Sequence, residues 1–139
     1  MYGKKEAQVS VEYLIIIGFV TLITIPLILI YYTFTQESTD DINSVQIDQI
    51  GKKIVDAAES VYYLGEPSQT TIRVKIPPNV VLADLSADYE VVFRLKTKQG
   101  EVDIVQNSAV NITGYLPTNE GTYLITIRAQ LNFVNVTYK

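Results

Sequence analysis

The sequence contains no cysteine and no histidine among its 139 residues. Without cysteine, the chain cannot form a disulfide or bind a metal through thiolates. Without histidine, it lacks the side chain that most often acts as general base, proton shuttle and metal ligand. The formal net charge of −4 provides no broad attraction to nucleic acid. We therefore expect no enzyme activity, no cofactor, no metal site and no nucleic-acid partner.

Charged residues are also absent from one long apolar run, Tyr13 to Gln36. As an α-helix this run is roughly 36 Å long, which is enough to cross a bilayer core of about 30 Å. Lys4 and Lys5 precede the run, and the next basic residue is Lys52. The positive-inside rule therefore predicts that the N-terminus stays in the cytoplasm while the C-terminal part lies outside the membrane.

The apolar run has two simpler interpretations. The apolar region of a secretory signal peptide is about 7–15 residues long and ends at a small-residue cleavage site. This run is longer and ends in Tyr-Tyr-Thr-Phe-Thr-Gln, so a signal peptide fits poorly. A single-span membrane anchor fits the composition and remains an alternative interpretation. Glu12, at the edge of the run, is costly there unless it lies among lipid headgroups or has a partner.

The residues before the run form a motif. A basic leader ends in a small residue, and the pattern Gln-x-Ser-x-Glu-aromatic follows directly ahead of the apolar run. This segment resembles the class III signal peptide of archaeal type IV pilins. The resemblance is confined to the N-terminal part of the chain and is carried by Lys4, Lys5, Ala7, Gln8, Ser10, Glu12 and Tyr13.

The resemblance implies a specific sequence of processing and assembly steps. A prepilin peptidase would cut between Ala7 and Gln8, removing residues 1–7 as a leader. An assembly platform and an ATPase would then move the subunit from the membrane into a helical homopolymer on the cell surface. In the family, an acidic residue at the fifth mature position, here Glu12 with Ser10 and Tyr13 beside it, helps to register each new subunit. The resemblance therefore implies an adhesive pilus, and an archaellin of a swimming filament is the related alternative.

One departure from the bacterial members of the family concerns the residue after the cut. They usually have Phe there, whereas this chain has Gln8. An N-terminal glutamine can cyclise to pyroglutamate, which has no positive amine. If Gln8 cyclises, Glu12 needs hydrogen-bond donors such as Ser10 instead of an amine partner.

The helical pattern continues beyond the apolar run. We predict a helix over residues 8–64, with a membrane-spanning part at 13–36 and an amphipathic part at 40–64. Residues 36–41 are either a short break between the two parts or an exposed turn of one continuous helix. Pro26 predicts a kink because it removes one backbone hydrogen bond. Apolar residues recur at three- and four-residue spacing in the second part: Ile47, Ile50, Ile54, Ala57, Ala58 and Val61.

From residue 66 onward, apolar and polar residues alternate, as in antiparallel strands with one buried face. The clearest alternations run over residues 72–76, 89–95, 123–131 and 134–138. We therefore predict an α+β fold, with the long N-terminal helix followed by an antiparallel β-sandwich-like head at residues 66–139 that is displayed outside the cell.

Two N-glycosylation sequons lie in the predicted head, Asn111-Ile112-Thr113 and Asn135-Val136-Thr137. Asn135 alternates with two valines, which places its side chain on the polar face of a strand. Sugars at these positions would coat the surface of the head. Several basic residues also occupy alternating strand positions, and we interpret them as a solvated sheet face: Arg73, Lys75, Arg94, Lys96, Lys98 and Arg128.

Overall fold

The computed structural model describes residues 3–85 and 89–139, with side chains from Ser10 onward. The chain forms two compact units, Met1–Thr39 and Asp40–Lys139. One helix, α1 (Gly3–Leu64), belongs to both units and is unbroken at residues 36–41. It ends at Gly65, whose positive φ of 79° and hydrogen bonds to the last carbonyls are typical of a helix C-cap.

In the first unit, α1 continues through Pro26, so the hydrogen bond lost there does not end the helix. Hydroxyl groups gather just after this region. Thr33, Thr35, Ser38 and Thr39 each donate a hydrogen bond to the carbonyl oxygen four residues earlier, at 2.9–3.0 Å. Because these hydroxyls are satisfied within the helix itself, they do not require water as a partner.

The second unit adds two β-sheets to the end of α1, which confirms the predicted α+β fold. The four-stranded sheet has the order β1 (Gln69–Ile76), β6 (Gly121–Ala129), β7 (Val134–Tyr138), β5 (Ile112–Gly114). The three-stranded sheet has the order β2 (Val80–Asp84), β3 (Glu90–Thr97), β4 (Gly100–Asn107). The pairing is antiparallel except between β5 and β7, which run parallel. The four-stranded sheet is therefore mixed, which the alternation pattern did not predict.

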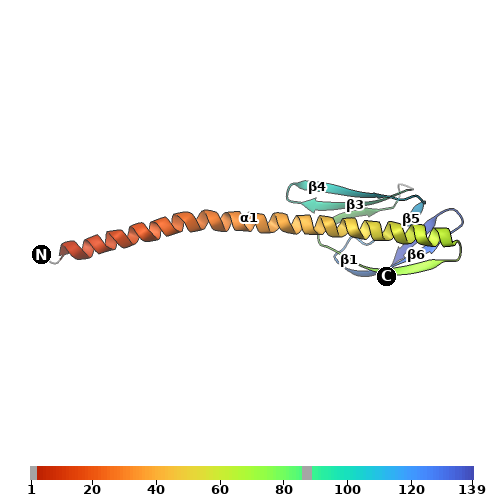
Figure 1. Ribbon diagram of the computed structural model, residues 1–139, viewed down its shortest axis with the longest axis horizontal. Coiled ribbons are helices and arrows are strands. Elements are labelled where there is room, and N and C mark those ends of the chain that lie inside the picture. The colour runs from red at the N-terminus through yellow and green to blue at the C-terminus, as the bar shows by residue number, and fades with distance from the viewer. Residues whose placement is uncertain (1–2, 86–88) are drawn as a thin grey trace. The chain divides into compact units, whose positions relative to one another are not determined.

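The part of α1 in the second unit lies between the two sheets (Figure 1). On one side Gln46 Nε2 donates to the carbonyl oxygen of Lys75 on β1, at 2.9 Å. On the other side Gln106 Nε2 of β4 donates to Asp48 Oδ1, at 2.6 Å. Gly51 is buried beside the same glutamine, and a Cβ there would lie 2.7 Å from Gln106 Cγ. The glycine thus allows β4 to pack closely against the helix.

Two carboxylates of α1 accept further hydrogen bonds from the residues on either side of β4. The backbone N–H of Lys98, just before the strand, donates to Asp40 Oδ2 at 3.1 Å. The backbone N–H of Ala109, just after it, donates to Glu59 Oε1 at 2.9 Å. Carboxylates on the helix therefore fix both ends of this edge strand.

The hydrophobic core of the second unit combines one stripe of α1 with the inner faces of both sheets. The apolar helix positions that recur at three- and four-residue spacing are buried or packed against the core. Three residues in the predicted alternations are exposed instead: Tyr89, Leu131 and Tyr138. The largest fully buried side chains are Phe93, Leu95, Ile47, Ile54, Ile76, Ile112, Ile125 and Ile127.

Candidate functional site

The apolar part of α1 is the most unusual surface of the chain. Every large apolar side chain from Val11 to Phe34 is exposed, from 43% at Ile23 to 72% at Tyr31. Because these residues follow one another without a polar stripe, they cover the whole circumference of the helix. Such a surface is stable in lipid or against other apolar helices, and not in water.

Among the described residues, the helix Ser10–Leu64 is long and apolar enough to cross a membrane. Its length and composition are compatible with a membrane span, and the bounds 13–36 stay a prediction.

The predicted processing and assembly residues lie on the first turns of α1. The backbone of Ala7 and Gln8 is helical, and their side chains lie outside the described residues. Ser10, Glu12 and Tyr13 are exposed, and Glu12 has no ion pair with any side chain described from Ser10 onward. A carboxylate at the margin of an apolar surface, with no ion pair among the described side chains, is available to a partner in another molecule.

Sequence reasoning missed two apolar residues at the start of the second unit. Ile42 and Val45 are 65% and 58% exposed, outside the buried stripe of α1. Together with Asp41, Gln46 and Gln49 they line a shallow hollow of about 330 Å³. The signal that could have found them is their spacing, because two apolar residues three apart fall on a helix face that is otherwise polar.

The structure brings the two sequons onto neighbouring strands. Asn111 precedes β5, Asn135 lies in β7, and Thr113 of the first sequon is the register partner of Asn135. The side-chain oxygen of Asn111 is buried without a hydrogen-bond partner among the described residues, while its backbone oxygen accepts the N–H of Val134. Asn135 is half-buried. Glycosylation at either position stays a prediction.

The basic residues predicted on strand faces do not gather on one surface. Arg73, Lys75 and Arg128 belong to the four-stranded sheet, whereas Arg94 and Lys96 belong to the three-stranded sheet. Within the described residues, no group of three or more side chains of the metal-binding types could hold a metal ion.

Comparisons of this chain with protein-family models, with curated proteins and with solved structures each found no match. Its fold and exposed surfaces define an α+β protein that combines a membrane-compatible apolar helix with a β-rich head.

Proposed function

We propose that this chain is a structural subunit of an archaeal type IV-like adhesive pilus and that it polymerises through its N-terminal apolar helix. One observation carries the proposal: the helix is apolar and exposed on all sides from Tyr13 to Phe34. From Asp40 onward, in contrast, the same helix buries one stripe against its own sheets. The first part therefore needs a partner that the described residues of the chain do not supply.

Two environments satisfy an all-apolar helix, a bilayer and a bundle of identical helices. A pilin uses both in turn. As a precursor it lies in the cytoplasmic membrane, and after processing at Ala7–Gln8 it enters a filament whose centre consists of such helices. Contacts that join two different surfaces of identical subunits produce an open helical fibre when the rotation from one subunit to the next does not close into a ring.

The motif ahead of the helix supports the filament over a plain anchor. A single-span anchor needs no acidic residue at the edge of its apolar run, and such a residue weakens insertion. In a filament, Glu12 would find its partner in a neighbouring subunit and would set the axial register. The sequence offers neither histidine nor cysteine for catalysis, and we propose a structural role without enzyme activity.

The proposal is tested on filaments sheared from cells that express the full chain. Mass spectrometry of their N-terminus should find a mature end at Gln8, free or cyclised, and electron microscopy should find this chain along the fibre. Ala7→Trp places a bulky side chain at the cut and should leave the precursor in the membrane. Tyr2→Trp, in the same leader but away from the cut, is the matched control and should assemble normally.

The second candidate, a membrane-anchored head, makes the opposite predictions. It retains Met1, stays monomeric in detergent and does not depend on Ala7. A surface protein with an intact leader and no fibre would therefore replace the pilin proposal with the anchor.

A further inference from the structure

Strand register places four polar side chains in one row across the outer face of the four-stranded sheet. Gln69 of β1 is opposite Arg128 of β6, which is opposite Asn135 of β7, which is opposite Thr113 of β5. These four residues are exposed or half-buried, and we call them the polar track. With strands about 4.8 Å apart, the track is roughly 14 Å long.

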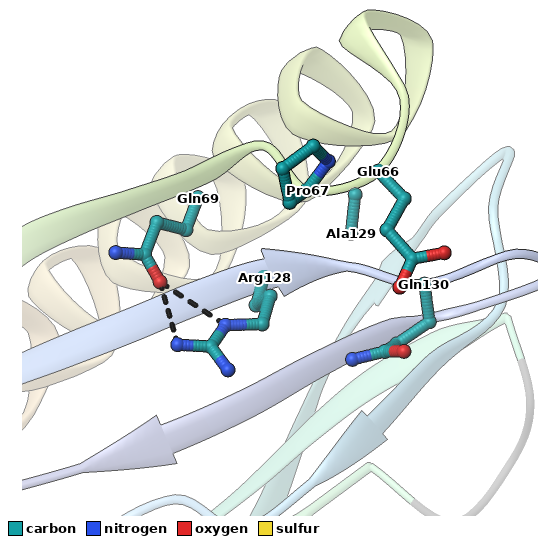
Figure 2. Close-up of a pocket in the computed structure, with 6 residues that line it drawn as sticks. All are labelled: Glu66, Pro67, Gln69, Arg128, Ala129 and Gln130. Atoms are coloured by element: carbon teal, nitrogen blue, oxygen red, sulfur yellow. Dashed lines mark hydrogen bonds between the residues drawn. The ribbon is translucent and has the colours of Figure 1, made fainter.

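Each end of the polar track opens into a surface hollow. At the first end, Gln69 and Arg128 line a hollow of about 420 Å³ together with Glu66, Pro67 and Gln130. Figure 2 shows Gln69 and Arg128 pointing toward one another, and Arg128 donates from Nε and Nη2 to Gln69 Oε1, at 3.0 and 2.8 Å. These bonds hold the guanidinium in a fixed orientation and leave its other three N–H donors uncommitted to the glutamine.

The hollow at the second end has an aromatic wall. Thr113 and Asn135 line it with Asp84 and Tyr115, and its volume is about 440 Å³. Tyr115 is 79% exposed, although its backbone N–H is fixed to the carbonyl oxygen of Val136 at 3.1 Å. The ring therefore extends from a fixed backbone position and offers a flat surface with an apolar face and a polar tip.

The chemistry of the polar track selects among ligand classes. It contains one charge, that of Arg128, whereas nucleic acids are bound by several basic side chains. It lies on the face of a sheet, so an extended peptide cannot pair with its backbone as it would at an edge. The track presents amide, hydroxyl and guanidinium groups in a row, with an exposed aromatic ring at one end. This arrangement matches a ligand that is rich in hydroxyl groups and also has flat apolar faces.

We propose that the polar track binds an oligosaccharide, with a terminal sugar ring on Tyr115 and hydroxyl groups hydrogen-bonded along Asn135 and Arg128. The inference goes beyond filament assembly, because the head would bind sugar in the same way on a pilus or on a membrane anchor. Its failure would therefore leave the pilin proposal untouched, and failure of filament assembly would leave the sugar site untouched.

The test uses the full chain from a host without N-glycosylation, in a detergent without a sugar headgroup. Maltotetraose, chitotetraose and a hyaluronan tetrasaccharide serve as probes in saturation-transfer NMR and calorimetric titration. At least one probe should bind with a Kd of roughly 0.1–1 mM, the weak range typical of a shallow site. Absence of saturable binding by all three probes would overturn the proposal.

Variants locate the binding. Arg128→Ala and Tyr115→Ala should each weaken it by about tenfold, which corresponds to the loss of one or two good contacts. Tyr115→Phe retains the ring and should retain most of the affinity. Arg73→Ala is the matched control, because Arg73 is exposed on the same sheet in a different row, beside Leu124. An equal loss with Arg73→Ala would indicate general charge attraction and would contradict the polar track as the site.

A second arm identifies the source of the sugar. If glycans on neighbouring copies of this chain occupy the polar track, glycosylated filaments of Thr137→Ala, in which Asn135 itself can carry no sugar, should bind the free probe more weakly than the unglycosylated protein. Equal binding would assign the track to sugars on another surface. Thermal unfolding of each variant, with an unchanged midpoint, confirms that the head remains folded.

Discussion

Arg94 on β3 and Asp103 on β4 face each other across the outer side of the three-stranded sheet, joined by two hydrogen bonds of 2.6 and 2.9 Å. These hydrogen bonds lower the pKa of Asp103, desolvation opposes the shift, and the positive charge of Arg94 adds to it. Both groups are open to solvent, so the pair contributes little to stability at neutral pH. Its consequence is a dependence of stability on pH.

The direction of that dependence follows from the lowered pKa. In an unfolded chain an aspartate has a pKa of about 3.9, so the stabilisation from this pair is present above that pH and disappears as the pH falls through the lower folded-state value. Asp103→Asn should therefore unfold at a slightly lower temperature than the wild type at pH 7, and the two midpoints should converge as the pH falls below the folded-state pKa of Asp103. Thermal unfolding followed by circular dichroism checks this. Asp56→Asn, at an exposed helix position, is the control, and a constant gap across pH would contradict the prediction.

Gly114 in β5 should not tolerate a side chain. Its φ is 131°, and an added Cβ would meet the carbonyl oxygen of Val136 on β7. Gly114→Ala should lower the free energy of unfolding by about 2 kcal/mol or more, because backbone strain and a steric clash act together. Gly100→Ala is the matched control: its φ is 133°, but nothing lies near the added Cβ. Urea unfolding should show a distinctly smaller loss in the free energy of unfolding for Gly100→Ala. Equal losses for the two variants would show that the close approach of Gly114 to Val136 is not the cause.

Local sequence patterns predicted the elements that have one buried face. The spacing of Ile47, Ile50 and Ile54 predicted the amphipathic part of α1, and period-two alternation predicted β1, β3, β6 and β7. The missed strands lack that signal. β2 contains a register shift between Val80 and Leu82, β5 has three residues, and β4 is exposed along most of its length, so its apolar residues do not mark one face.

The two proposed functional surfaces likewise differ in whether a local sequence pattern can reveal them. The motif from Gln8 to Tyr13 is continuous in sequence, so it could be recognised without a fold. The polar track joins Gln69, Thr113, Arg128 and Asn135, which lie on four strands. Only the pairing register brings them together, and register depends on tertiary packing that no short window of sequence contains.

Phe93 should be the most costly single position in the head. Its side chain is fully buried on the central strand β3, beside the register partner Ile104 on β4. Phe93→Ala should lower the free energy of unfolding by about 3–5 kcal/mol, through lost burial and the cavity that remains. Val105→Ala, at a neighbouring position that is 44% exposed, should change it by no more than about 0.5 kcal/mol. Similar urea midpoints for the two variants would contradict this placement of the core.

Glu12 should decide whether the apolar helix can form a filament. A carboxylate between packed apolar helices is tolerated only with a partner, and that requirement permits one axial register and disfavours the others. Glu12→Ala should leave processing at Ala7 intact while reducing filaments on cells by more than about tenfold, because losing such a pair costs several kcal/mol per contact. Glu37→Ala, at the other end of the run, is the control and should assemble normally.

A third variant distinguishes between the possible partners of Glu12 in a neighbouring subunit. Glu12→Gln retains the shape and hydrogen-bonding capacity of the side chain without its charge. If the partner is the amine of a neighbouring Gln8, the variant should fail to assemble, and if Gln8 is cyclised and the partner is a neutral donor, it should assemble. Filament counts by electron microscopy, with N-terminal mass spectrometry of the same material, distinguish these outcomes. Normal filaments from Glu12→Ala would show that the subunits find their register without this residue.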